Sequence, residues 1–116
     1  MSLLIFHNPR CGKSREALQY LQQKNVEFQI VLYLHDTPSF EEMKQIISKL
    51  KIKPLDLIRK KENIFKENFS GQDLSDDEWI HILIQHPILI ERPLIISDRS
   101  AVIGRPKENI EKLFKA

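Results

Sequence analysis

The sequence predicts an α/β fold, in which a mixed four-stranded sheet forms the core and a helical subdomain is inserted into it. Three observations lead to this prediction. The chain starts with a strand–helix–strand pattern, helical patterns dominate its middle, and a predicted β-hairpin followed by a helix closes it. Its 116 residues are enough for one compact domain and too few for two ordinary ones.

The first part of the chain predicts two parallel strands joined by a helix. The apolar run Leu3–Phe6 ends in a turn, and apolar residues from Ala17 to Leu21 then recur at helical spacing. Val26–Leu34 alternates and is rich in β-branched and aromatic residues, so we expect the second strand there. Elements this close in sequence favour a βαβ unit with a right-handed crossover.

The middle of the chain is predicted to be helical. Two capping boxes, in which a serine precedes a glutamate by three positions, mark helix starts: Ser39 with Glu42, and Ser75 with Glu78. We expect the first helix over Ser39–Lys51, a short helix after Pro54, and another that stops before Pro87. Residues 37–87 are therefore expected to form the inserted helical part.

The last part of the chain predicts a hairpin and a helix. The apolar runs Pro93–Asp98 and Ser100–Gly104 are separated by a short turn and should pair antiparallel. Pro106 suits the first position of a final helix. The order βαβ, helices, ββα is that of a thioredoxin-like fold with an insertion. We expect one domain over 1–116, with its core in 1–36 and 88–116.

Composition excludes several classes of function. The formal net charge is +2, and basic residues alternate with acidic ones, so we expect no nucleic-acid binding. Apolar runs such as Ile82–Ile84 are too short for a bilayer, and we see no signal peptide, so we expect no membrane association. One cysteine fits a reducing, cytoplasmic location. The four histidines lack metal-ligand spacing, so we expect no metal.

Cys11 is the one cysteine, and it lies in the segment HNPRCGKSRE between the predicted first strand and helix. A free cysteine is often a buried, inert residue. At a helix start, however, free N–H groups and the helix dipole favour an anion. Three cations, Arg10, Lys13 and Arg15, lie nearby in sequence. In such surroundings a thiol pKa falls from about 8.5 to roughly 3.5–7.5, which predicts a nucleophilic thiolate.

Three other known types of site agree less well with the segment around Cys11: a phosphate-binding Walker motif, a cysteine phosphatase loop and a dithiol redox site. Gly12-Lys13-Ser14 ends like a Walker motif, but His7 stands where that motif needs its first glycine. A cysteine phosphatase would need arginine at the position of Ala17. Ser14 replaces the second cysteine of a dithiol site, so a resolving thiol must come from another molecule. The Ser14 hydroxyl is expected to bind the thiolate or the helix backbone, unless it is simply a first-turn residue.

Three arginines further along the chain are candidate anion ligands: Arg59 in LIRKKE, Arg92 in LIERPLI and Arg105 in VIGRPKE. Each alone would suit an exposed surface. In the thioredoxin-like order, however, the segment Arg92-Pro93 faces the start of the first helix, and an X-Pro bond there can be cis. Arginines that converge near a thiolate lower its pKa and hold a polyanionic substrate for attack.

The segments FHNPRCGKSRE, LIRKKE, HPILIERPLI and IGRP together resemble the short branch of the glutaredoxin-coupled arsenate reductase family (ArsC-like) over nearly the whole chain. The resemblance implies an oxidoreductase with Cys11 as the nucleophile and no bound cofactor. It implies that the oxyanion is bound by Arg59, Arg92 and Arg105, and that Pro93 is the cis proline of the fold. The residues around the thiolate would be His7, Asn8, Ser14 and Arg15.

The resemblance also implies a reaction sequence. The Cys11 thiolate attacks arsenate, or a similar oxyanion, and expels water or hydroxide. Glutathione, as co-substrate, attacks the arsenic adduct, arsenite leaves, and glutaredoxin removes glutathione from Cys11. Two alternatives stay open. CGKS at Cys11–Ser14 resembles the CGFS of monothiol glutaredoxins, which favours a glutathione-dependent thiol oxidoreductase. A Spx-like RNA polymerase-binding adaptor is the non-enzymatic alternative.

Overall fold

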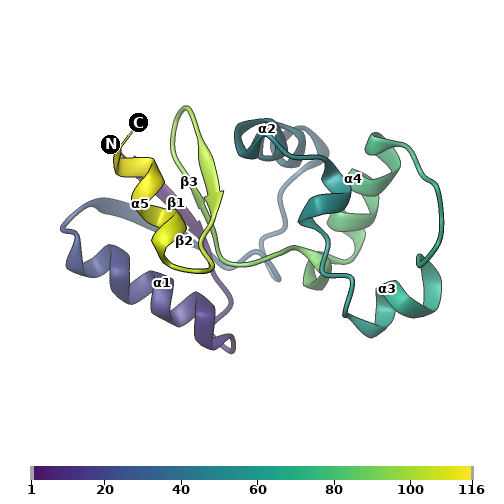
Figure 1. Cartoon of the computed structure of the whole chain (residues 1–116), viewed down its shortest axis with the longest axis horizontal. Coiled ribbons are helices and arrows are strands. Elements are labelled where there is room, and N and C mark those ends of the chain that lie inside the picture. Colours follow the sequence, from purple (N-terminus) through teal and green to yellow (C-terminus); the bar gives the residue numbers. More distant parts are fainter. Residues whose placement is uncertain (1, 116) are drawn as a thin grey trace. The chain divides into compact units, whose positions relative to one another are not determined.

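The computed structural model describes residues 2–115 (Figure 1). Its elements in chain order are β1 (Ser2–Phe6), α1 (Gly12–Gln23), β2 (Glu27–Val31), α2 (Phe40–Leu50), η1 (Pro54–Leu57), α3 (Asn63–Asn68), α4 (Asp76–Gln85), η2 (Pro87–Leu89), β3 (Leu94–Ile96), β4 (Ala101–Ile103) and α5 (Glu108–Lys115). Internal contacts divide the chain into a core unit, which runs up to Asp36 and resumes at Arg92, and a helical unit, Thr37–Glu91.

The core unit contains the mixed four-stranded sheet that the sequence predicts, and this α/β prediction is confirmed. The strand order is β2-β1-β3-β4. β1 runs parallel to β2, with Ser2 opposite Glu27, and antiparallel to β3, with Phe6 opposite Leu94. β3 and β4 form the predicted antiparallel hairpin. The carboxyl end of β1 therefore leads directly into the turn that carries Cys11.

Alternation along β1 determines how the core unit packs. Leu3 and Ile5 are fully buried and point to one face of the sheet, where α1 and α5 cover them. The buried residues of this cluster are Leu3, Ile5, Ala17, Leu21, Ile95, Ile110 and Leu113. Helix α1 contributes Ala17 and Leu21, which follow the helical spacing read from the sequence. This packing holds the start of α1 next to the end of β1.

Two predicted boundaries in the core unit are wrong. β2 ends at Val31 and not at Leu34, because the chain turns there: the N–H groups of His35 and Asp36 both donate to Leu32 O, each at 2.9 Å. The last helix begins at Glu108 and not at Pro106. Pro106 lies instead in a tight turn, closed by a 3.0 Å hydrogen bond from Asn109 N to Pro106 O.

Both predicted capping boxes are present in the helical unit. At the start of α2, Glu42 N donates to Ser39 Oγ at 3.2 Å and Ser39 N donates to Glu42 Oε1 at 3.1 Å. Ser75 and Glu78 make the same pair of bonds ahead of α4. Each box satisfies two N–H groups that a helix start leaves without an intrahelical partner. α2 and α4 then pack against each other.

Helix α3 was not expected from the sequence. It spans six residues and buries only Phe65, whose ring lies 6.1 Å from that of Trp79. One buried residue gives no helical period to read. The helical unit also extends further than the predicted 87, to Glu91, because Ile90 forms a bridge with Ile58 and Glu91 N donates to Leu57 O at 2.8 Å.

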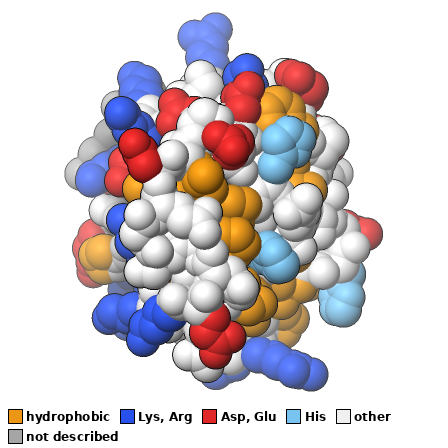
Figure 2. Space-filling view, turned by 90° about the vertical axis from the view of Figure 1, so that its right-hand side faces the viewer, with side chains coloured by type: hydrophobic (Ala, Val, Ile, Leu, Met, Phe, Trp, Pro, Cys, Tyr) orange, Lys and Arg blue, Asp and Glu red, His pale blue; other side chains and the backbone are white. Residues whose placement is uncertain are grey.

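Hydrophobic side chains reach the surface on the face seen in Figure 2. They gather in a strip that is bordered by histidines and by charged residues of both signs. Exposed apolar area of this kind is common on globular proteins and does not by itself mark a site. No helix among residues 2–115 combines the length and the apolar character that are needed to cross a bilayer.

Gly104 is predicted to be intolerant of a side chain. A Cβ built there would lie 2.6 Å from Ile95 Cδ1 and 3.1 Å from Pro93 Cγ, and Gly104 N donates to Pro93 O at 2.8 Å. Gly104→Ala should therefore lower the free energy of unfolding by about 1–3 kcal/mol through overpacking. Urea unfolding would measure the change. In the control Gly12→Ala, the new Cβ would approach Arg15 Nη2 no closer than 3.8 Å, so an equal loss there would contradict the account.

Candidate active site

Asn8 organises the turn between β1 and α1. Its N–H donates to Ser14 Oγ, its carbonyl oxygen accepts from Cys11 N and its Oδ1 accepts from Arg10 N, each at 3.0 Å. Asn8 is buried, and these bonds use its backbone groups and its side-chain oxygen together. As a result, Cys11 occupies the N-cap position of α1 with an extended backbone (φ −99°, ψ 122°).

The pKa of Cys11 lies below its ordinary value. Burial is the largest single influence and raises this pKa, because it disfavours the charged form. The N–H of Ser14, a hydrogen bond from the Arg92 side chain and the N–H of Lys13 lower it, and together they outweigh burial. The Arg92 charge adds to this effect. The thiol is only partly buried, so it is both activated and accessible.

The cations next to Cys11 in sequence are not the main cause of this activation. Arg15 Nη1 donates to Pro9 O at 2.9 Å and so folds back over the turn. Lys13 Nζ lies 3.4 Å from Glu16 Oε2 in an exposed ion pair, and Arg10 is exposed. The leading contributions come instead from backbone N–H groups at the helix start and from Arg92. The expected helix-start effect is therefore present, whereas the local side-chain charges contribute less.

Ser14 and His7 form a buried pair behind the turn. Ser14 Oγ lies 2.7 Å from His7 Nδ1 and accepts a hydrogen bond from Asn8 N, so the hydroxyl is engaged away from the thiol. The pKa of His7 is lowered, first by burial and then by the Arg15 charge, which keeps the ring neutral at pH 7. The hydroxyl therefore binds the backbone of the turn at Asn8, and not the helix backbone that was one of its two expected partners.

Ser14→Ala should lower the stability of the fold without changing the pKa of Cys11. The change leaves the buried Asn8 N–H without its acceptor, so the free energy of unfolding should fall by about 1–3 kcal/mol. The pKa of Cys11 should stay nearly constant, because alanine keeps the N–H that acts on the thiolate. Denaturant unfolding and a thiol alkylation titration test the two halves. The exposed control Ser48→Ala should change stability by about 0.5 kcal/mol or less. A large rise in the thiol pKa of Ser14→Ala would instead place the hydroxyl at the thiolate.

Two hydrogen-bond donors of Arg92 are available to bind a ligand. Its Nε and Nη1 are buried and have no hydrogen-bond partner within the described residues. A buried donor of a charged group is costly to leave unpaired, so such donors point to an anionic ligand. Arg92 precedes Pro93 through a cis peptide bond, at the start of β3, which pairs with β1. The core unit therefore brings an arginine with free donors to the Cys11 thiol.

The other two predicted arginines differ from Arg92. Arg105 follows β4, is partly exposed, and is joined to Pro106 by a second cis peptide bond that the sequence analysis did not anticipate. Arg59 lies in the helical unit, where its guanidinium faces two carboxylates: Nη1 lies 2.9 Å from Glu62 Oε1, and Nε lies 3.6 Å from Glu91 Oε1. Neither glutamate was expected from the sequence to contact Arg59. The three-residue spacing of Arg59 and Glu62 on the chain could have indicated the first pair.

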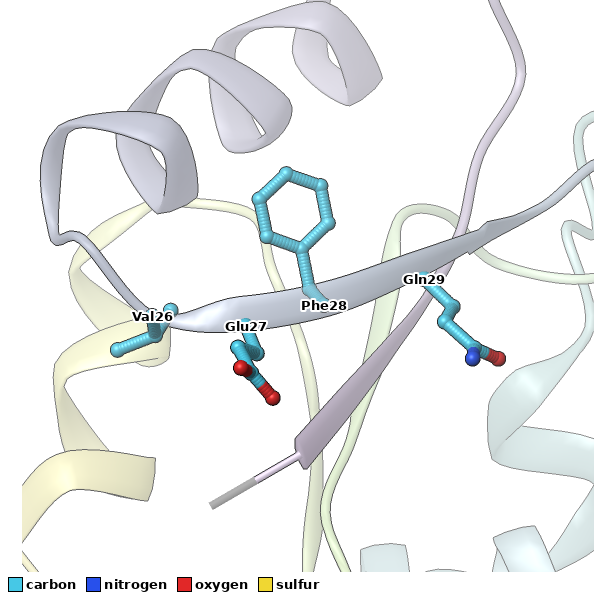
Figure 3. Close-up of a pocket in the computed structure, with 4 residues that line it drawn as sticks. All are labelled: Val26, Glu27, Phe28 and Gln29. Atoms are coloured by element: carbon cyan, nitrogen blue, oxygen red, sulfur yellow. The ribbon is translucent and has the colours of Figure 1, made fainter.

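A shallow pocket on β2 lies away from this turn. Val26, Glu27, Phe28 and Gln29 line it, and Figure 3 shows Phe28 on the opposite side of the strand from Glu27 and Gln29. Glu27 is opposite Ser2, at the amino end of β1, whereas Cys11 follows the carboxyl end. The pocket therefore has no part in the candidate site.

Comparisons with known proteins identify the family of this chain. A sequence model of the ArsC family matches residues 6–113. The arsenate reductase of Haemophilus influenzae is 40% identical over 116 residues, which cover 98% of this chain and 100% of that protein. The arsenate reductase of Neisseria meningitidis is 38% identical over 112 residues, which cover 95% and 96%.

A solved structure supports the fold in the same way. The arsenate reductase from Vibrio cholerae superposes with a TM-score of 0.89 at 38% identity, covering 96% of this chain and 97% of that one. The thioredoxin-like prediction is thereby confirmed. The similarity extends over the elements of both units and includes the turn that carries Cys11. The chain belongs to the ArsC family.

Proposed function

We propose that the protein is an arsenate reductase that uses the Cys11 thiolate as nucleophile and glutathione and glutaredoxin as reductants. The observation that carries this proposal is the pairing of an activated thiol with Arg92, whose buried Nε and Nη1 have no hydrogen-bond partner among residues 2–115. A tetrahedral oxyanion supplies the oxygen acceptors that these donors need. The names of the relatives from Haemophilus influenzae and Neisseria meningitidis support the same substrate.

The proposed chemistry requires three thiols, of which this chain supplies one. The Cys11 thiolate forms a sulfur–arsenic(V) bond, and one arsenate oxygen leaves as water or hydroxide. A glutathione thiolate then attacks the Cys11 sulfur, and the electron pair of the sulfur–arsenic bond goes to arsenic, which leaves as arsenite. Cys11 is left in a mixed disulfide with glutathione. A glutaredoxin thiol takes up that glutathione by disulfide exchange and restores Cys11.

The environment of Cys11 suits each step. A lowered pKa provides the thiolate for the first attack and makes Cys11 a better leaving group in the last exchange. Neutral His7 adds no second positive charge behind the turn. No second cysteine is present, so the mixed disulfide has to be resolved by another molecule. We propose a cytoplasmic location because Cys11 must be kept reduced between turnovers.

A coupled assay tests the proposal. Arsenate-dependent NADPH oxidation is measured with glutathione, glutaredoxin and glutathione reductase, and each component is then omitted in turn. The proposal predicts that the signal disappears when arsenate, glutathione or glutaredoxin is omitted. Turnover that persists without glutathione and glutaredoxin would contradict the proposed reductants. Reduction of a small glutathione mixed disulfide, with no response to arsenate, would instead favour a glutaredoxin-type thiol oxidoreductase.

A further inference from the structure

β2 is an edge strand whose outer side is open. The strand order β2-β1-β3-β4 leaves it paired on one side only, with β1. Glu27, Gln29 and Ile30 are exposed, so this edge is accessible. The pocket in Figure 3 is lined by residues from both faces of the strand, which places it along the edge. β2 therefore presents backbone groups with which a further strand can pair.

The hydrogen bonds to β1 show which groups of β2 point outward. In a strand, the N–H and C=O of one residue point to one edge, and those of the next residue point to the other. Val31 O accepts from His7 N at 2.9 Å, so Val31 faces β1, as does Gln29 two positions before it. The N–H and C=O groups of Phe28 and Ile30 therefore point away from the sheet. Within residues 2–115, no backbone group outside the sheet pairs with them.

This edge lacks the features that commonly protect an edge strand from pairing. β2 contains no lysine, proline or glycine, and its one charged residue is Glu27. Three large apolar side chains are exposed in the described part of the chain, and two of them, Ile30 and Leu32, lie on β2 or directly after it. The opposite edge strand, β4, is three residues long, whereas β2 has five. The edge of β2 is thus better suited to pairing than that of β4.

We propose that two copies of this chain pair through β2, antiparallel and about a two-fold axis at Gln29. This register places Phe28 of each copy opposite Ile30 of the other. Because the outward groups belong to these residues, each pair exchanges two backbone hydrogen bonds. Each pair also joins an aromatic and a β-branched side chain, which stabilises antiparallel strands. Glu27 lies opposite Val31 of the second copy, so no like charges meet. The edge is complementary to itself, and a second copy is therefore its partner.

The size of the contact predicts a weak dimer. The paired strands extend over roughly 17 Å, at about 3.4 Å per residue. A contact of this length falls below the roughly 1,200 Å² that stable interfaces bury, so we expect a Kd of about 10–100 μM. The pairing uses neither Cys11 nor Arg92, so the inference is independent of the proposed function.

Sedimentation velocity between about 5 and 500 μM tests the dimer. The wild-type protein should shift from monomer to dimer over this range. Ile30→Lys, which places a charge on the open edge, should raise the Kd by roughly tenfold or more. Ile88→Lys is the matched control and should leave the Kd unchanged, because Ile88 is an exposed isoleucine of the helical unit, at 39% against 48% for Ile30. A wild-type protein that stays monomeric throughout, or an equal loss in both variants, would overturn the inference.

Disulfide cross-linking in a Cys11→Ser background tests the register. Gln29→Cys places two thiols in a non-hydrogen-bonded pair, where Cα atoms about 4.5 Å apart permit a disulfide. Glu27→Cys is the control, because Glu27 is exposed and lies on the same side of the strand. Its two copies would be roughly 14 Å apart, too far for a disulfide.

In a buffer of oxidised and reduced glutathione, Gln29→Cys should give at least about tenfold more linked dimer than Glu27→Cys. Equal or preferential cross-linking of Glu27→Cys would contradict the proposed pairing. Urea unfolding checks that each variant folds, and the cross-linking comparison decides alone if Ile30→Lys does not.

Discussion

Cys11→Ser is expected to abolish arsenate reduction, with a fall in rate of roughly 10³-fold or more, because a serine hydroxyl at the same position stays protonated and forms no sulfur–arsenic bond. The fold should be unaffected, since Cys11 is partly exposed and its backbone groups, not its thiol, hold the turn: its N–H donates to Asn8 O and its O accepts from Arg15 N. The coupled NADPH assay measures the change.

The control for this variant is Ser14→Ala, which keeps the thiol and its N–H donors. It should retain measurable activity at temperatures where it is folded, while Cys11→Ser stays inactive at every temperature. Far-UV circular dichroism would check that both variants are folded. Robust arsenate turnover by Cys11→Ser would refute the assignment of Cys11 as nucleophile, and the protein would then need a different route to arsenite.

Arg92→Ala is expected to raise the pKa of Cys11. The reason is that Arg92 lowers this pKa through both a hydrogen bond and its charge, and a hydrogen bond to a charged group contributes about 1.5–3 kcal/mol. Only the thiolate is alkylated, so the alkylation rate rises as the pH passes the pKa of Cys11. This rise should occur at a lower pH in the wild-type protein than in the variant. Iodoacetamide alkylation rates between pH 5 and 10 measure both midpoints.

The same substitution should weaken oxyanion binding by about tenfold or more, because it removes the Nε and Nη1 donors, which have no partner in the described part of the chain. Compared with Arg92→Ala, Arg92→Lys should return the pKa of Cys11 most of the way to its wild-type value. It should recover less of the oxyanion affinity, because an ammonium supplies the charge but not the planar pair of donors of a guanidinium. Arg99→Ala, which removes an exposed cation from the β3–β4 turn, serves as the control. A thiol titration that is the same in Arg92→Ala and in the wild-type protein would remove Arg92 from the account.

The sequence predicted the fold from features that are local in the chain. The Ser39–Glu42 and Ser75–Glu78 boxes lie within one helical turn, and the Ala17 to Leu21 spacing reflects one helix face. Such signals need no knowledge of distant contacts. Helix α3 was missed because Phe65 is its only buried residue. The boundary near residue 87 was placed too early because Ile90 pairs with Ile58, far away in sequence.

The sequence was enough to predict which residues belong to the candidate site. It was not enough to predict which hydrogen-bond partners those residues have. The position of Cys11 at a helix start followed from the strand–turn–helix pattern. The direction of the Ser14 hydroxyl depends on where His7 and the Asn8 N–H lie in three dimensions, which spacing does not determine. For the same reason, the arginines looked alike in sequence. Within residues 2–115, however, two donors of Arg92 have no partner, whereas Arg59 faces Glu62 and Glu91.

The most direct test of the central claim is a single-turnover reaction with reduced protein, arsenate and glutathione, in which glutaredoxin is left out. Arsenite is quantified, and intact-protein and peptide mass spectrometry identify the modified residue. The account predicts about one arsenite per chain, together with a glutathione mixed disulfide on Cys11 that glutaredoxin then removes. Arsenite formation that leaves Cys11 unmodified, or repeated turnover without glutaredoxin, would contradict it.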